Sequence, residues 1–237
     1  MRSESQIFEL ILSVAQRDER VRAVILNGSR ANSKVAKDNL QDFDIVYLVK
    51  ELDSFKANPD WIDIFGERII FQTPNSMNLY ENDINSNAEE LVYLMLFKDY
   101  NRIDLTLIKT KNKDKRKDSL TQILLDKDKL YDVQSPNDRD YFIRKPTQKE
   151  FSECCNEFWW VSTYIVKGLL RDEIIYAINI QETIVRKMFM KVLAWNIAAE
   201  YEFKINLGKN YRFIKKYIAT KTMNQIKYTY SDFTKID

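Results

Sequence analysis

The chain contains no histidine, and it has only two cysteines in 237 residues. Without histidine, Ser-His-Asp and Cys-His nucleophile systems and every histidine-ligated metal site are excluded. Any bound metal must therefore be held mainly by oxygen, which favours Mg²⁺ or Mn²⁺, and any general base must be a carboxylate or a lysine with a shifted pKa. Cys154 and Cys155 are adjacent and badly placed for a disulfide with each other, so we expect two buried thiols in a reducing cytoplasm.

Long apolar runs are also missing, since no stretch approaches the roughly 20 residues that a membrane-spanning helix needs. Met1 to Ser5 begin a charged amphipathic segment and do not resemble a signal peptide. Charge is nearly balanced, with 37 Lys and Arg against 35 Asp and Glu, whereas proteins that bind nucleic acid through its phosphates are usually more basic. We expect a soluble, cytoplasmic protein without a membrane or nucleic acid partner, and its oligomeric state stays open.

The first half of the chain alternates short β-branched and aromatic blocks with turn residues, a pattern typical of strands. The expected strands are Val21–Leu26, Phe43–Val49, Arg68–Gln72, Leu91–Phe97 and Arg102–Ile108, the last two forming a hairpin. Helical spacing predicts a helix from Ser3 to Arg17, begun by a capping box of Ser3 and Gln6. A loop is predicted over Met77 to Ala88, and a further helix from Ser119 to Tyr131.

Helices replace strands after Pro146. Thr147 and Glu150 form a capping box that predicts a helix through Tyr164. A long helical pattern with one break covers Arg171 to Glu202, and after Gly208 a helix is expected to resume over Tyr211–Ala219. The sequence therefore predicts an α+β protein with two domains, residues 1–145 around a β-sheet and residues 146–237 as a helical bundle.

Three aspartates on the predicted strands are the strongest candidates for chemistry. Asp42 and Asp44 share one face of a strand, and Asp104 stands alone among apolar residues of another. Neighbouring carboxylates repel each other unless a cation lies between them. The Gly28-Ser29 turn lets backbone amides approach a phosphate, to which the serine hydroxyl adds a donor. This combination predicts a two-metal site for phosphoryl or nucleotidyl transfer.

Several stretches resemble the aminoglycoside 6-nucleotidyltransferases, also called streptomycin adenylyltransferases, of the nucleotidyltransferase superfamily. The resemblance lies in Asn27–Arg30, Gln41–Tyr47, Trp61–Arg68, Arg102–Leu107, Glu150–Phe151, Cys154–Tyr164 and Leu207–Tyr211. It covers most of the chain, and the Phe-Trp-Trp block is far more specific than the superfamily signature. It implies an N-terminal nucleotidyltransferase domain, with a mixed sheet flanked by helices, and a C-terminal helical domain that binds substrate.

The resemblance also implies roles for single residues. Asp42 and Asp44 would hold two Mg²⁺ ions, and Asp104 would complete the catalytic ion and help to deprotonate the attacking hydroxyl. Ser29 would bind the β- or γ-phosphate of ATP, with Arg30 nearby. A hydroxyl of the aminoglycoside, the 6-hydroxyl of streptomycin if the likeness extends to substrate, would attack the α-phosphorus and release pyrophosphate, which would confer antibiotic resistance.

An acidic, aromatic segment of the second domain is a candidate surface for a polycationic drug. Glu153 and Glu157 lie four apart on one helix, followed by Trp159 and Trp160. Charge-assisted bonds and cation–π stacking would suit guanidinium groups. The alternative is that the tryptophans are buried between helices and the glutamates are solvated. We favour burial for the tryptophans and leave the glutamates open.

Two more residues of the second domain have two readings each. Glu182 is a candidate substrate residue or general base, although an exposed helix pair with Arg186 is the favoured reading. Lys209 would reach the triphosphate or be a surface lysine.

Two other functions remain open. One is a nucleotidyltransferase that modifies a protein or RNA, as in toxin–antitoxin systems, and the other is a non-catalytic relative that binds nucleotide or drug. Members of the resembled family usually run some tens of residues longer, so we expect either a shortened relative or an incomplete helical domain.

Overall fold

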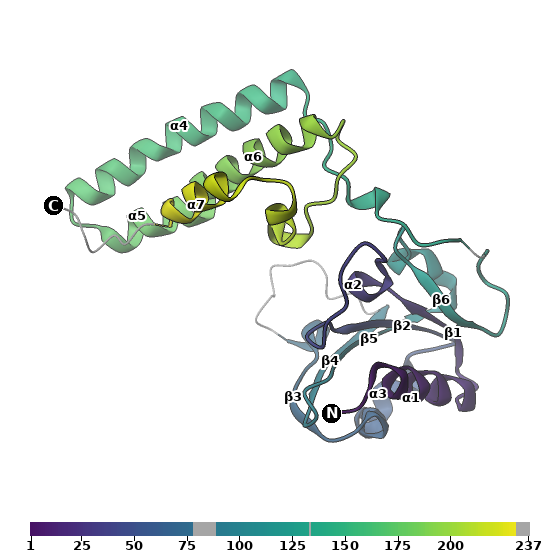
Figure 1. The fold of residues 1–237 in the computed structure, drawn as a ribbon. Helices are drawn as coiled ribbons and strands as arrows, with labels where there is room; N and C mark the ends of the chain where they lie inside the picture. The colour runs from purple at the N-terminus through teal and green to yellow at the C-terminus, as the bar shows by residue number, and fades with distance from the viewer. Residues whose placement is uncertain (78–88, 133, 231–237) are drawn as a thin grey trace. The chain divides into compact units, whose positions relative to one another are not determined.

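The protein divides into two compact units, Met1–Asp138 and Arg139–Asp237, which are described separately. The computed structural model describes residues 1–77, 89–132 and 134–230, drawn as solid ribbon in Figure 1. The loop predicted over Met77 to Ala88 lies outside these residues except for Met77. None of the helices in this part of the chain has the length and apolar character required to cross a bilayer.

The first unit is built on a mixed six-stranded sheet with the order β3-β4-β5-β2-β1-β6. The β2–β5 pair is parallel, and the other neighbouring strands are antiparallel. The strands are β1 (Val21–Leu26), β2 (Phe43–Val49), β3 (Arg68–Gln72), β4 (Glu90–Phe97), β5 (Arg102–Lys109) and β6 (Gln122–Asp126). The predicted hairpin is confirmed, because β4 pairs with β5 from Leu96↔Arg102 onward.

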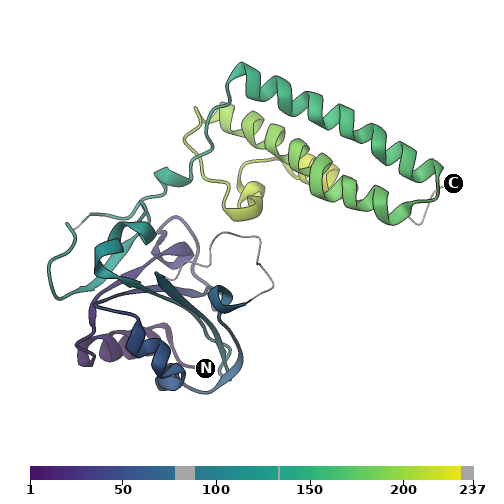
Figure 2. The same cartoon turned by 180° about the vertical axis from the view of Figure 1, so that it is seen from behind.

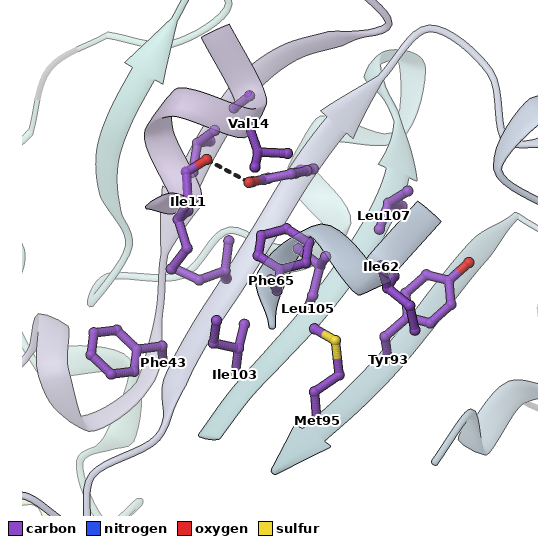
Figure 3. Packing of buried hydrophobic residues seen from close by; sticks show 14 of the residues in the cluster. Ile11, Val14, Phe43, Ile62, Phe65, Tyr93, Met95, Ile103, Leu105 and Leu107 are labelled. Carbon is purple, nitrogen blue, oxygen red and sulfur yellow. Dashed lines mark hydrogen bonds between the residues drawn. The ribbon is translucent and has the colours of Figure 1, made fainter. Parts of the chain in front are cut away.

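Helices α1 (Glu4–Arg17) and α3 (Asp53–Ala57) lie on one face of this sheet, next to the 3₁₀ helix η1 (Pro59–Phe65). The predicted capping box starts α1, since the Gln6 N–H donates to Ser3 Oγ and the Ser3 N–H to Gln6 Oε1. The buried face of α1 packs on strand residues such as Phe43, Ile103 and Leu105 (Figure 3). The dashed line in Figure 3 is the hydrogen bond from the buried Tyr47 hydroxyl to the Ile11 carbonyl, 2.6 Å.

Strand alternation directs the predicted site residues to the other face. Phe43, Ile45 and Tyr47 of β2 enter the core beneath α1, so Asp44 points to the opposite side. The same parity in β5 places Ile103 and Leu105 in that core and turns Asp104 away. On the opposite face a smaller cluster includes Val46, Leu48 and Ile108. The two carboxylates therefore sit where this second apolar cluster ends.

The helix predicted for Ser119–Tyr131 is wrong. This segment contains strand β6, which pairs antiparallel with β1 through Ala23↔Asp126 and Leu26↔Gln122. Strand β1 would otherwise leave a row of unpaired backbone groups at the edge of the sheet, and pairing with β6 satisfies them. Tertiary context therefore overrides the local helical preference.

The second unit is helical, as predicted. Its helices are α4 (Gln148–Leu170), α5 (Ile174–Ile180), the π-helical turn η6 (Gln181–Val185), α6 (Arg186–Glu200) and α7 (Thr220–Tyr228), with 3₁₀ helices η5 (Arg139–Tyr141), η7 (Lys209–Tyr211) and η8 (Ile214–Lys216). Thr147 caps α4 in the predicted capping box with Glu150. Helices α4 and α6 run side by side in both views (Figures 1 and 2). The long pattern predicted from Arg171 to Glu202 runs as α5, the π-helical turn and α6 without a gap, so the π-helical turn is the one irregularity between these two helices. Asp172, with a positive φ of 59°, lies between α4 and α5.

The helix predicted over Tyr211–Ala219 is wrong as well, since only single 3₁₀ turns form there and α7 begins at Thr220. Gly208 has a φ of 71°, and the Phe213 N–H donates to the Leu207 carbonyl, which closes a tight loop. The second unit also takes in residues 139–145, because Ile143 packs on its core and bonds to Ile205 through the backbone.

Candidate active site

Asp44 and Asp104 are brought side by side by the parallel pairing of β2 with β5. The two residues are direct register partners, and both point to the sheet face opposite α1. Adjacent strands lie about 4.8 Å apart, so two carboxylates in this register are close neighbours. Both side chains border a hollow of about 280 Å³ together with Gly28, Thr106 and Arg116. The sheet thus joins aspartates that are 60 positions apart in the numbering of the chain.

The Gly28-Ser29 turn is the start of a one-turn helix, α2 (Gly28–Ala31). Gly28 has a φ of 70°, and a Cβ built on it would lie 1.9 Å from Asp44 Oδ2. Only glycine lets the backbone approach this carboxylate so closely. The first N–H groups of a helix have no acceptor within the helix and attract anions. Ser29, in the same turn, is partly exposed.

Asp42 is held at the entrance to β2 by Arg30. The guanidinium of Arg30 donates to the carbonyls of Gln41, at 2.7 Å, and Asp42, at 3.1 Å. It also bonds to Glu4, and it stacks 3.8 Å above the ring of Phe43. Its side chain is 5% exposed, so this arginine fixes the loop that carries Asp42. The sequence did not predict this role, and contact of Arg30 with a phosphate stays a prediction.

Arg102 lies among the carboxylates, although it was not one of the predicted site residues. Its Nε and Nη2 atoms donate to Oδ1 and Oδ2 of Asp104, both at 2.7 Å, and its Nε lies 3.8 Å from Asp42 Oδ1. The hydrogen bond to Asp104, followed by the charges of Asp42 and Asp44, raises the pKa of Arg102. Its position two residues before Asp104 on one strand was the signal that could have found it.

The three aspartates do not form a ready ligand cage. Within residues 1–77, 89–132 and 134–230, no group of three or more acidic or cysteine side chains is arranged to hold a metal ion. Asp104 instead directs both carboxylate oxygens to Arg102. The donors are hard oxygens, and a cationic guanidinium already lies between Asp42 and Asp104. The chemistry of this donor set fits a divalent cation such as Mg²⁺.

Arg116 is a second functional candidate that the sequence did not single out. It ends the 3₁₀ helix η4 (Thr110–Arg116), which also carries Lys111, Lys113 and Lys115. Its guanidinium bonds to Glu90, and its backbone carbonyl accepts from Asn27 Nδ2 at 2.8 Å. Arg116 borders the same hollow as Gly28 and Asp44. No local pattern distinguishes it from the lysines around it.

The prediction that Trp159 and Trp160 are buried between helices is wrong, since they are 70% and 62% exposed. The buried side of α4 is a narrow row of residues seven positions apart, Cys154, Val161 and Gly168. The two tryptophans lie outside that buried row. Cys155 is only partly buried, so burial of both thiols is confirmed for Cys154 alone.

Glu153, Glu157 and Trp160 follow one another at helical spacing and are all exposed. Trp160 Nε1 donates to the Tyr164 hydroxyl at 2.9 Å, which extends the same face of α4 by one turn. Lys149 Nζ lies 3.7 Å from Glu153 Oε1 on this face. We call these four residues, Glu153, Glu157, Trp160 and Tyr164, the α4 stripe.

Glu182 lies on the π-helical turn and forms the predicted helix pair with Arg186, but the pair is not fully exposed because Arg186 is buried. Arg186 donates to both of its oxygens, at 2.6 and 2.7 Å, and to the hydroxyl and carbonyl of Thr229. The hydrogen bond to Glu182 raises the pKa of Arg186, whose side chain is 8% exposed. Lys209 is an exposed residue after Gly208. A role for Glu182 or Lys209 toward substrate stays a prediction.

Comparison with known proteins connects this chain to one family. The family model for streptomycin adenylyltransferase matches residues 1–236. An aminoglycoside 6-adenylyltransferase of Bacillus subtilis (strain 168) is 43% identical over 98% of this chain and 82% of its own length. One from Campylobacter jejuni is 42% identical over 98% of this chain and 80% of its length. A crystal structure of an aminoglycoside 6-adenyltransferase from Bacillus subtilis is 40% identical, covers 98% of this chain and 81% of that chain, and has a TM-score of 0.46. The chain therefore belongs to the streptomycin adenylyltransferase family of enzymes, as the sequence motifs predicted.

Proposed function

We propose that the protein transfers AMP from ATP to a hydroxyl of an aminoglycoside, specifically the 6-hydroxyl of streptomycin, and so confers resistance to that drug in the cytoplasm. The observation that carries the proposal is the register pairing of Asp44 with Asp104 beside Gly28. The relatives named above are aminoglycoside 6-adenylyltransferases, which supports the choice of acceptor. The reaction forms a bond from the acceptor oxygen to the α-phosphorus and breaks the bond to the β-phosphate, with pyrophosphate as the leaving group.

Asp42, Asp44 and Asp104 would hold two Mg²⁺ ions, because their hard oxygens suit this metal. When bound, these ions would neutralise the triphosphate and stabilise the charge that develops on the attacking and leaving oxygens. A carboxylate oxygen of Asp104 would accept the proton of the attacking hydroxyl. The position of Asp104 on β5, an interior strand of the sheet, supports both roles.

The triphosphate would be held by cationic and N–H donors around the hollow. The backbone of Gly28 and the hydroxyl of Ser29 would donate to phosphate oxygens, as donors at the start of a helix do. Arg116 borders the hollow and would add a charge-assisted bond. Lys209, an exposed residue, stays a separate candidate for nucleotide binding. Arg30 would act indirectly, by fixing the Asp42 loop through the Gln41 and Asp42 carbonyls.

The α4 stripe would bind the acceptor, and Glu182 would add a further carboxylate. Streptomycin carries guanidinium groups, which pair with carboxylates and stack on aromatic rings. Glu153, Glu157 and Trp160 are exposed on one face of α4, so they are accessible to such a ligand. Trp160→Phe should weaken streptomycin binding, measured by calorimetry, whereas Trp159→Phe is the matched control because Trp159 is exposed but off the stripe. Equal losses in both variants would remove the stripe from the proposal.

The decisive experiment is mass analysis of streptomycin after incubation with the protein, ATP and Mg²⁺. A gain of one adenylate, with release of pyrophosphate, is the expected result. Asp44→Asn should abolish the product, and Asp128→Asn is the control, since Asp128 pairs with Arg22 on the surface. Drug binding without any product would instead favour a non-catalytic binder, and label transferred from ATP to protein or RNA in a lysate would favour a macromolecular acceptor.

A further inference from the structure

The contact between Arg102 and Asp104 has a geometry that bears on metal binding. Two parallel hydrogen bonds of 2.7 Å join the guanidinium to the two oxygens of Asp104. The same Nε lies 3.8 Å from Asp42 Oδ1. This two-pronged pairing is the strongest that an arginine makes with a carboxylate. The guanidinium of Arg102 thus lies where a cation would bind, between Asp42 and Asp104, two of the three proposed metal ligands.

A metal ion and this guanidinium compete for the Asp104 oxygens, because both are cations that bind the same carboxylate. Each oxygen keeps a further lone pair, but a metal ion bound there would lie close to the positive charge of Arg102, so Asp104 binds a metal more tightly once that pair breaks. An arginine does not give up its proton in a protein, so deprotonation offers no way to release the carboxylate. The side chain of Arg102 can therefore release Asp104 only by swinging away, while its backbone stays in β5.

The structure provides space for such a movement. Arg102 borders a second hollow, of about 490 Å³, whose lining includes Phe71, Gln72 and Leu94. Leu94 is the register partner of Asp104 on β4 and borders both hollows, so the second hollow adjoins the carboxylates. The side chain of Arg102 is 42% exposed, and a partly exposed arginine reorients at lower cost than a buried one.

We propose that Arg102 is a built-in competitor for the metal site, a positioning residue that occupies Asp104 and the edge of Asp42 and weakens the binding of a divalent cation until it is displaced. The inference rests on the proposed function, because it takes these carboxylates as the metal ligands. It predicts that free divalent cations bind this enzyme more weakly than its three carboxylates alone would allow. Removing the guanidinium should therefore strengthen metal binding.

The test is Mn²⁺ affinity without nucleotide, measured from the electron paramagnetic resonance signal of free Mn²⁺. Arg102→Gln should bind Mn²⁺ roughly fivefold more tightly than the wild type, since a partly exposed ion pair contributes up to about 1 kcal/mol. The Mn²⁺ affinity of Arg102→Lys should fall between those of the wild type and Arg102→Gln, because an ammonium group cannot form two parallel hydrogen bonds to a carboxylate. Arg116→Gln is the control for the general loss of a positive charge near the hollow. Its gain in Mn²⁺ affinity should be smaller than that of Arg102→Gln.

The outcomes separate this inference from the function beneath it. Equal or weaker binding in Arg102→Gln, or a gain no larger than that of Arg116→Gln, overturns the competitor role. If Asp44→Asn still abolishes Mn²⁺ binding in that case, the metal site itself stands. Absence of Mn²⁺ binding in both the wild type and Arg102→Gln overturns the metal assignment and the inference together. Thermal unfolding of each variant confirms that it is folded before the titration.

Discussion

Gly28 and Asp44 approach each other so closely that no side chain fits between them. A Cβ at position 28 would lie 1.9 Å from Oδ2 and 2.7 Å from Cγ of Asp44. The backbone N–H of Asn27 also donates to the Asp44 carbonyl at 2.9 Å. The loop after β1 is therefore held against β2 at the point where the candidate carboxylates begin.

Gly28→Ala should reduce adenylyl transfer at least ~100-fold, because the new methyl group displaces the Asp44 carboxylate and small misplacements of reacting groups are costly. Its positive φ should also cost about 1–3 kcal/mol of stability. Gly66→Ala is the matched control. Gly66 has a φ of 122°, but its nearest neighbour is the flexible Arg2 side chain, 3.3 Å away. Turnover assays and urea unfolding should show two destabilised proteins, of which only Gly28→Ala is inactive; equal activity loss would contradict the role of Gly28.

Arg116→Gln should raise the KM for ATP about tenfold and change kcat little, because it removes one charge-assisted bond to the triphosphate. Lys115→Gln is the neighbouring control. Lys115 and Arg116 each pair with a glutamate, Glu89 and Glu90, but only Arg116 borders the hollow beside Asp44. Steady-state kinetics at saturating drug measure both variants. The same KM in both would remove Arg116 from the nucleotide site.

Tyr47→Phe should destabilise the first unit by about 1–2 kcal/mol, since it deletes a fully buried hydrogen bond to the Ile11 carbonyl. Burial also raises the pKa of Tyr47, so the hydroxyl stays protonated as a donor. Tyr131→Phe removes a similar bond, to the Lys113 carbonyl, at a partly exposed site and should cost less. Urea unfolding followed by circular dichroism gives both values, and a larger loss for Tyr131→Phe would contradict the dependence on burial.

The start of α4 should become sensitive to pH below the usual range of a glutamate. The hydrogen bond from Arg144, helped by the Thr147 N–H, lowers the pKa of Glu150 from 4.5 to about 2. A carboxylate with a lowered folded-state pKa stabilises the fold above its unfolded value, and this contribution is lost as the pH falls from about 4.5 toward 2.

Glu150→Gln, which cannot titrate, isolates this contribution. The urea midpoint of the wild type should exceed that of the variant at pH 7, and the difference should shrink between pH 4.5 and 2. Glu153→Gln is the control, since Glu153 lies on the same helix, is 64% exposed and has no capping role. A difference that stays constant down to pH 2 would show that the Arg144 pair adds nothing to stability.

Much of the candidate site could be read from local sequence. Alternation in Phe43-Asp44-Ile45 directs Asp44 away from the core, and the capping boxes at Ser3 and Thr147 start helices where they were expected. These signals are local because they depend on a residue and neighbours within four positions. Strand β6 could not be predicted in this way, because its pairing partner β1 lies about a hundred residues earlier in the chain.

The sequence by itself limited the chemistry and identified the family: without histidine any metal site must be built mainly from oxygen, Asp42, Asp44 and Asp104 were its candidates after a Gly-Ser turn, and the motifs predicted the family that the comparison shows. Only the tertiary structure decided which arginine side chains lie near those carboxylates. Arg102 lies on Asp104, Arg116 borders the hollow, and Arg30 is committed to the Asp42 loop. Register between strands and packing against distant residues set these partners, and neither is encoded in the local pattern around an arginine.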